Sequence, residues 1–215
     1  MAATAKASTS VRKRVGSPTS KTRALIVEST EQLMLEEGYA SVTYRSVAAR
    51  ADVTAGLVQY YFPTLDDLFL AVVRKLTDRI LEGLDRAFQT EQPLRTVWNY
   101  ASNQAGAALL VEFMALANHR KKIWDELGEG GERVRRAQLQ ALSERWEQYG
   151  IAEEDLPPAA LLFMFTAIGR MARLEEAFGT HTGHDEAIAI VERFLDAVEP
   201  APKRGRRPTA APTAQ

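Results

Sequence analysis

The chain has 215 residues, of which 46% are apolar and 26% charged, a composition that fits one or two soluble globular domains. It contains no cysteine and only three histidines. This excludes disulfide scaffolds, thiol nucleophiles and cysteine-based metal sites, and we expect neither a metal nor a cofactor. The most apolar stretches, residues 105–111 and 157–169, are shorter than the ~18 residues of a membrane helix. The first residues lack an apolar secretion signal, so we expect a cytoplasmic protein without membrane contact.

The net charge of −1 is unevenly distributed along the chain. Residues 1–23 carry +6 and residues 200–215 carry +4, both without an acidic residue, which leaves −11 on residues 24–199. Basic ends on an acidic body are typical of arms that bind a polyanion, although such tails also serve solubility alone. Both ends have few large apolar side chains, so residues 1–18 and 200–215 are predicted to be a disordered basic arm and tail.

The first half of the folded region is predicted to be helical. Ile26, Thr30 and Leu33 give one buried face to a helix from about Ser20 to Glu37. Two short helices follow, about 44–50 and 55–61, each preceded by a threonine suited to cap it. Residues 51–53 form the tight turn between them, and Pro63 ends the unit.

The remaining residues continue the helical pattern without a convincing strand. The pattern predicts a long helix over 65–88, a helical region over 94–118 with a break near 102–106, and a linker at Gly128–Gly131. Further helices are expected around 139–149, over 157–178 and over 185–198. We therefore predict an all-α fold of about nine helices, with a helix-turn-helix domain over 19–64 and a helical domain over 65–199.

The second and third helices have the geometry of a helix-turn-helix, whose second helix can enter the DNA major groove. In the segment 54–62, Val58, Tyr61 and Phe62 can pack inward, which leaves a polar face outward. Gln59 can form two hydrogen bonds with adenine, and threonine or tyrosine hydroxyls can donate to phosphate oxygens. Gly56 costs helix stability, which makes sense if DNA approaches the backbone there. The predicted DNA-binding residues are Lys21, Arg23, Thr43, Tyr44, Arg45, Thr54, Ala55, Gly56, Gln59 and Tyr60.

At these residues the chain resembles the TetR family of bacterial repressors. The resemblance covers about 50 residues and is carried by Gly38-Tyr39, Thr43, Val47-Ala48, the turn at 53–56, Tyr61-Phe62 and Leu68. It implies a homodimer, a palindromic double-stranded DNA operator and a small-molecule pocket in the C-terminal domain. The family usually has a lysine after the aromatic pair, whereas this chain has Leu65 followed by Asp66 and Asp67.

Two charged residues interrupt apolar runs in the C-terminal domain. Glu112 and Arg170 either face solvent or pair with one another, and because a lone buried charge is costly both are candidate ligand anchors. Aromatic residues of a bundle core also commonly line ligand pockets. The predicted ligand-binding residues are Trp98, Asn99, Glu112, Phe113, Met114, Trp124, Phe163 and Arg170. A second apolar face on the last helix points to subunit contact, and the predicted dimerisation residues are Leu161, Phe165, Ile168, Ile190 and Phe194.

These patterns favour a transcriptional repressor that a small, largely apolar ligand releases from its operator. One alternative is a DNA-binding regulator controlled by a protein partner without a ligand. Another is a helical-bundle carrier or enzyme, which we disfavour because the sequence has no paired carboxylates at catalytic spacing, no glycine-rich phosphate loop and no paired nucleophile and base.

Overall fold

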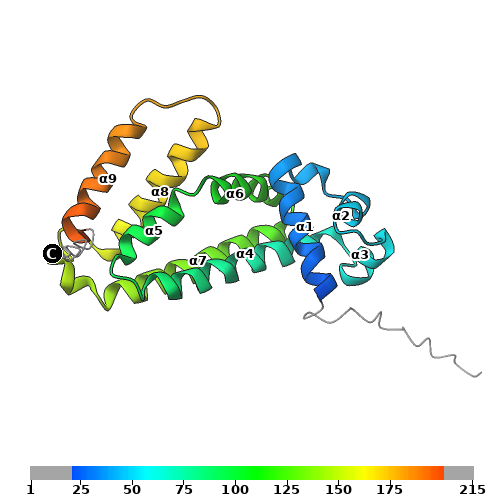
Figure 1. The fold of residues 1–215 in the computed structure, drawn as a ribbon, viewed down its shortest axis with the longest axis horizontal. Coiled ribbons are helices and arrows are strands. Elements are labelled where there is room, and N and C mark those ends of the chain that lie inside the picture. Colours follow the sequence, from blue (N-terminus) through cyan, green and yellow to red (C-terminus); the bar gives the residue numbers. More distant parts are fainter. Residues whose placement is uncertain (1–20, 201–215) are drawn as a thin grey trace, which may run out of the picture. The chain divides into compact units, whose positions relative to one another are not determined.

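The computed structural model describes residues 21–200, and these residues contain only helices and the turns that join them (Figure 1). The predicted basic arm, the predicted tail beyond Pro200 and the expected start of the first helix at Ser20 lie outside the described residues. No described helix combines the length and the apolar character needed to cross a membrane. The α-helices are α1 (Lys21–Glu37), α2 (Tyr44–Arg50), α3 (Ala55–Tyr61), α4 (Leu65–Ala87), α5 (Pro93–Ala101), α6 (Gln104–Ala117), α7 (Lys121–Ser143), α8 (Pro158–Glu176) and α9 (His184–Val198).

The described residues form two compact units, and the first comprises residues 21–77 and 109–130. It contains α1, α2, α3 and the adjoining parts of α4, α6 and α7. Apolar side chains from all of these helices form one core, centred on residues that are almost fully buried. They include Ile26, Val47, Val58, Phe62, Phe69, Phe113 and Ile123. The N-terminal helices are therefore not an isolated module, because α6 and α7 contribute to their core.

The ends of the short helices form as their sequence predicts. The side chain of Thr43 accepts a hydrogen bond from the backbone N–H of Ser46, and the Ser46 hydroxyl accepts one from the N–H of Thr43. Thr54 likewise accepts from the N–H of Leu57. Such caps satisfy helix N–H groups that have no partner within the helix, and each contributes about 1 kcal/mol. Gly38, which follows α1, has φ of 79°, a conformation that favours glycine.

The second unit comprises residues 78–108 and 131–200. Its core is built around Trp98, Leu142, Leu162, Phe165 and Leu195. A single carboxylate ties three segments of this unit together.

That carboxylate belongs to Glu199, just after α9. It accepts hydrogen bonds from the backbone N–H groups of Leu94 and Arg95 and from the Tyr149 hydroxyl. It therefore caps α5 from a distant part of the chain, which is favourable because the start of a helix carries partial positive charge.

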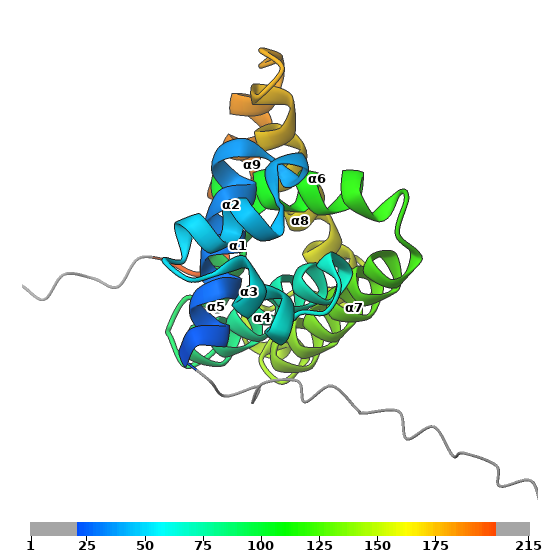
Figure 2. The same ribbon diagram turned by 90° about the vertical axis from the view of Figure 1, so that its right-hand side faces the viewer.

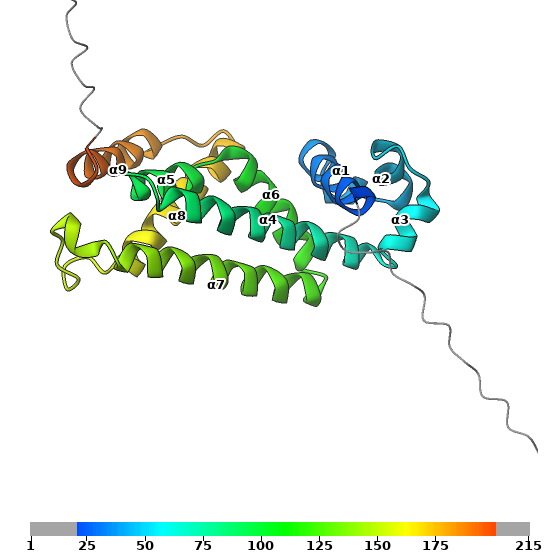
Figure 3. The ribbon, with the colours of Figure 1, turned by 60° about the horizontal axis from the view of Figure 1, so that its bottom comes forward.

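The prediction of a linker at Gly128–Gly131 is wrong, because these residues lie inside α7. Ile123, Leu127, Val134 and Leu142 continue one apolar face across the glycines, and burial of that face outweighs their low helix propensity. Packing explains why position 130 is a glycine. A Cβ atom at this position would lie 2.7 Å from the Thr77 hydroxyl oxygen, so the absence of a side chain lets α7 approach α4. Figure 3 shows the two helices running side by side there.

The remaining boundaries agree with the predictions within a few residues. The expected break near 102–106 separates α5 from α6 (Figure 1). The helix expected around 139–149 is the end of α7, followed after Ser143 by a short 3₁₀ helix, Trp146–Tyr149.

Gly169 in α8 marks the closest helix contact of the second unit. A Cβ atom there would lie 2.9 Å from the backbone carbon of Ala101 at the end of α5, and 3.0 Å from the Ser102 nitrogen. Backbone atoms cannot move aside as a flexible side chain can. The missing side chain at Gly169 is therefore what allows α8 to lie against α5.

We predict that Gly169→Ala lowers the free energy of unfolding by about 1–3 kcal/mol, because the added methyl group forces the two helices apart. Gly131→Ala in α7 is the matched control, since nothing lies within 4 Å of its added Cβ. That variant should gain about 0.5–1 kcal/mol from helix propensity. Urea denaturation at equal protein concentrations measures both changes. A Gly169→Ala protein as stable as the wild type would contradict the close contact.

Candidate nucleic-acid interface

A tight turn sets the angle between α2 and α3. Asp52 adopts a positive φ of 51°, which aspartate tolerates better than most residues, and the N–H of Val53 donates to the Ala48 carbonyl at 3.0 Å. The turn thus reverses the chain within Ala51–Val53, as the sequence predicts. Figure 2 shows α1, α2 and α3 grouped together, with the α2–α3 turn on the outside of the group.

The inward side of α3 fixes which of its side chains face outward. Val58 and Phe62 are 0% and 1% exposed, and Val53 and Tyr61 pack against the same core. Thr54, Gly56, Gln59 and Tyr60 are exposed, while Ala55 is half-buried. No atom lies within 4 Å of a Cβ built on Gly56, so the helix surface is open there. The structure therefore brings the polar residues of this predicted surface onto one face.

The residues predicted at the start of α2 have different surroundings. Arg45 is exposed, but the Tyr44 hydroxyl donates to the carbonyl oxygens of Phe62 and Pro63 at 3.2 and 3.0 Å. Desolvation, and secondarily the negative charge of Asp67, raises the pKa of this hydroxyl. Tyr44 thereby connects the start of α2 to the end of α3 and fixes their relative positions.

The two basic residues at the start of α1 also differ from each other. Lys21 is exposed. The Arg23 guanidinium lies over the Phe62 ring, 4.8 Å from its centre, a favourable cation–π arrangement. In this structure Arg23 therefore helps to cover the end of α3.

The acidic residues after the aromatic pair have structural partners. Asp67 accepts from the backbone N–H and the hydroxyl of Thr64, and Thr64 accepts from the N–H of Asp67, so the two residues cap α4 reciprocally. Asp66 forms an ion pair with Arg120 in the α6–α7 turn. The departure from the family's usual lysine thus stabilises the start of α4 and connects it to the α6–α7 turn.

Glu112 in α6 contacts the segment between α1 and α2. Its carboxylate accepts a 2.7 Å hydrogen bond from the Tyr39 N–H, and a Cβ built on Gly38 would lie 3.3 Å from the same oxygen. Sequence analysis expected Glu112 to face solvent or to pair with Arg170, and the structure shows neither. A backbone N–H freed by the turn at Gly38 provides its partner, which sequence spacing does not reveal.

The predicted ligand-binding residues divide between the two units. The first unit holds Glu112, Phe113, Met114 and Trp124, and the second holds Trp98, Asn99, Phe163 and Arg170. Phe113 and Trp98 are buried core residues, and the Trp98 indole N–H donates to Glu192 at 2.8 Å. Met114, Trp124 and Phe163 are more than half exposed.

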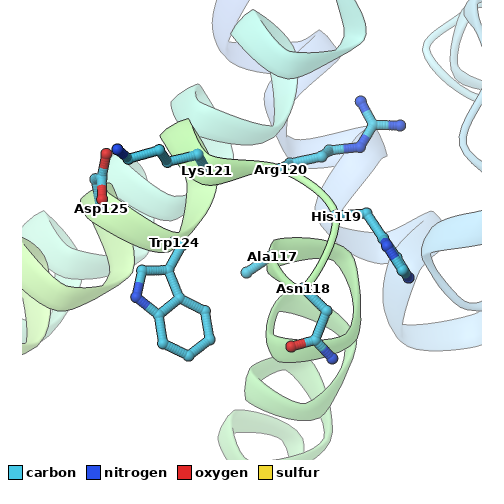
Figure 4. A pocket seen from close by; sticks show the side chains of 7 residues that line it. All are labelled: Ala117, Asn118, His119, Arg120, Lys121, Trp124 and Asp125. Atoms are coloured by element: carbon cyan, nitrogen blue, oxygen red, sulfur yellow. The ribbon is translucent and has the colours of Figure 1, made fainter.

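Trp124 lines an open pocket of about 580 Å³ at the α6–α7 turn. Figure 4 shows its indole beside Ala117 and Asn118, with His119 and Arg120 pointing to the other side of the turn. Polar and charged side chains make up most of its lining, whereas ligand pockets in helical bundles are usually lined mostly by apolar side chains.

The predicted dimerisation residues require a correction. Leu161 and Phe165 are buried in the core of their own chain, at 3% and 2% exposure, so they cannot contact a partner directly. Ile168 and Phe194 are half-buried, and Ile190 is 58% exposed. Met164, Met171 and Phe178, on or just after α8, are exposed apolar residues that lie outside the predicted set. They follow the helical period on the side away from Leu161 and Phe165, and that period was the available signal.

This geometry defines an all-helical protein with an N-terminal helix-turn-helix. A family model described as "Bacterial regulatory proteins, tetR family" matches residues 26–72. Over these residues the chain is therefore similar to the DNA-binding domain of the TetR family of transcriptional regulators.

Individual relatives agree with this assignment. The HTH-type transcriptional regulator PksA of Bacillus subtilis is 28% identical over 119 residues, which cover 51% of this chain and 58% of that relative. A TetR transcription regulator from Haloarcula marismortui has a TM-score of 0.66 at 20% identity and covers 82% of this chain and 97% of its own. A putative TetR-family regulator from Mesorhizobium loti also has a TM-score of 0.66, at 14% identity, and the match covers 85% of this chain and 96% of its own. At such identities the two structures show the shared fold.

We predict that Tyr44→Phe lowers the free energy of unfolding by about 1 kcal/mol, because the carbonyls of Phe62 and Pro63 lose their donor. Tyr60→Phe, which removes an exposed hydroxyl, is the matched control and should change stability by no more than about 0.5 kcal/mol. Since the pKa of Tyr44 is raised in the folded protein, its contribution is present below the ordinary tyrosine pKa of about 10 and is lost as the pH rises further. Urea denaturation at pH 7 compares the variants, and equal losses in both would remove the role assigned to Tyr44.

Proposed function

We propose that the protein is a cytoplasmic DNA-binding transcriptional repressor that acts as a homodimer on a palindromic operator and leaves it when a small molecule binds. The observation that carries this proposal is the exposed face of α3, in which Thr54, Gly56, Gln59 and Tyr60 point outward from a fully buried Val58. A short polar helix surface held on a rigid core is what a major groove can accept.

The chemistry of this face assigns separate roles to its residues. Gln59 is free to form two hydrogen bonds with the edge of adenine. The hydroxyls of Thr54 and Tyr60 donate to phosphate oxygens, and the open backbone at Gly56 lets the duplex come close. Arg45 at the start of α2 and Lys21 at the start of α1 add positive charge for phosphates.

A homodimer is supported by the apolar side chains that α8 and α9 leave exposed. Met164, Met171, Phe178 and Ile190 are between 41% and 77% exposed and belong to the same unit. Exposed apolar residues on neighbouring helices are a common feature of interaction surfaces in soluble proteins. Two copies joined there would present two α3 helices to half-sites about 34 Å apart, one turn of DNA.

Release by a ligand requires that the ligand bind the state that cannot hold DNA more tightly than the state that can. The first unit contains contacts suited to transmit such a change. Glu112 of α6 binds the turn after α1, and Lys75 of α4 pairs with Glu28 and Glu31 of α1. A displacement of α6 or α4 would therefore pull on the helix that supports α2 and α3.

We predict that Gln59→Ala and Tyr60→Ala each weaken operator binding without loss of fold. The expected loss is about 1–3 kcal/mol if Gln59 forms two hydrogen bonds with a base. Gln32→Ala is the matched control, because Gln32 is exposed on α1 and outside the proposed surface. Gel-shift titrations on an operator selected from bound genomic fragments give the affinities. Unchanged affinity in both α3 variants would overturn the assignment of this surface to DNA.

We predict that Ile190→Glu converts the dimer into monomers at micromolar concentration, because the partner surface would then have to bury an unpaired carboxylate. Met114→Glu places the same charge on an equally exposed apolar position of α6 and is the control. Sedimentation velocity reports the oligomeric state. A wild-type monomer, or dissociation in the Met114→Glu variant alone, would contradict the proposed interface.

A further inference from the structure

Three helices of the second unit bring two arginines and a tyrosine close together. Tyr100 lies at the end of α5, Arg135 in α7 and Arg170 in α8. The close approach of Gly169 to Ala101 places Arg170 next to the end of α5, and the Arg173 Nε donates to the Ser102 carbonyl at 3.0 Å in the same contact. Electrostatic interactions join Tyr100 to Arg170 and Arg170 to Arg135, and Arg79 of α4 adds a further positive charge that acts on Tyr100.

Neither Arg135 nor Arg170 has an acidic hydrogen-bond partner within the described part of the chain. The Nη1 atom of Arg135 is shielded from solvent and forms no hydrogen bond there. The nearest acid on its own helix is Glu132, whose carboxylate binds Arg136 at 2.8 Å. By contrast, the nearby Arg173 pairs with Glu176 at 2.7 Å, and Arg95 pairs with both Glu192 and Asp196.

Burial and mutual repulsion both act against the charges of this pair. Desolvation lowers the pKa of the Arg135 guanidinium and the neighbouring charge of Arg170 lowers it further, against a smaller opposing effect of Glu132. Desolvation also lowers the pKa of Arg170, although that residue is exposed overall. Arginine nevertheless keeps its proton at any physiological pH, so the two like charges remain side by side. A negatively charged group bound between them would offset both the desolvation of the guanidinium groups and their mutual repulsion.

The surroundings of Arg170 suit a molecule that is anionic only at one end. Phe163 lies seven residues earlier in α8, on the same face of the helix, and is 66% exposed. Leu174 lies one turn after Arg170 and is half-buried. A polar head at the arginines would thus continue into an apolar surface along α8.

We propose that Tyr100, Arg135 and Arg170 bind the oxyanion head group of the effector, a carboxylate or phosphate attached to an apolar chain. Guanidinium groups match the geometry of both oxyanions, and the Tyr100 hydroxyl supplies a further donor. This inference rests on the proposed function in that it names the chemical class of the molecule that releases the operator. It also corrects the expectation of a largely apolar ligand by giving that ligand a charge.

The first test uses the full chain without ligand. Arg135→Met and Arg170→Met keep most of the side-chain stem and remove the charge, so each variant should melt at the same temperature as the wild type or higher. Arg173→Met is the matched control and should melt lower, because Arg173 holds Ser102 and Glu176. A drop in melting temperature in all three variants would assign Arg135 and Arg170 a structural role and overturn the proposal.

The second test measures binding of octanoate, octyl phosphate and neutral octanol by calorimetry. We expect one of the two anions to bind, octanol to bind at least about tenfold more weakly, and both arginine variants and Tyr100→Phe to lose about tenfold or more in affinity for that anion. The anion that binds distinguishes a carboxylate from a phosphate head. Binding of octanol as tight as that of the anions, no binding of either anion, or unchanged affinity in the variants would each overturn the site.

Gel shifts with the anion that binds separate this inference from the proposed function. Release of wild-type protein from the operator, with the arginine variants retained on DNA, supports the anion as effector. Binding of the anion without release overturns its role as effector. Failure of the wild-type chain to bind any DNA would instead contradict the proposed function. The calorimetric result on the anion site would remain valid.

Discussion

The orientation of α3 depends on the burial of two side chains, Val58 and Phe62. Both project from α3 into a core that also contains Val47 of α2 and Ile26 of α1. Full burial of side chains of this size contributes about 1.5–3 kcal/mol each, while the polar face on the other side of the helix stays hydrated. A helix of seven residues is too short to be stable alone, so this packing also keeps α3 helical. The buried side of α3 therefore determines which residues its exposed side presents to a partner.

A set of polar contacts then holds this core against α4, α6 and α7 within the first unit. Lys75 connects α4 to two glutamates of α1, and Arg74 binds Glu126 of α7 at 2.8 Å. Hydrogen bonding to Glu126 raises the pKa of Arg74 despite its partial burial. Surface ion pairs contribute little singly, but Glu31 and Glu126 are largely buried and would be costly without their partners. Ion pairs therefore connect the helix-turn-helix to α4, and α4 to α7, within the first unit.

The local elements of this unit could be read from the sequence, because their signals are local. Thr43 and Thr54 cap helices within three residues of themselves, and the apolar spacing in α1 and α3 identifies their buried sides. The exposed residues of α3 followed from that spacing alone. The partners of Tyr44, Arg23 and Glu112 did not, since each lies on another helix and contacts a backbone group or ring that no sequence motif marks.

The prediction of a linker at Gly128–Gly131 was wrong because a local signal, the glycine cluster, was outweighed by packing against other helices. Glycine clusters usually end helices, but here the apolar face of α7 continues through them and Gly130 fits against Thr77. Likewise, Leu161 and Phe165 could not be distinguished from dimer contacts by periodicity, because α8 is apolar on more than one side. Only the position of α5 and α9 decides which side is core.

The same position of α5 against α8 creates the unpaired arginines. Gly169 allows the end of α5 to approach α8 so closely that Arg170 lies beside Tyr100, and Arg173 satisfies the Ser102 carbonyl freed at the end of α5. Arg173 is thus explained by the packing of the helices, whereas Arg170 and Arg135 are not. Two adjacent cations that no carboxylate binds directly weaken a folded domain, and a bound anion would lower that cost. This difference between paired and unpaired arginines is the basis of the ligand site proposed for the second unit.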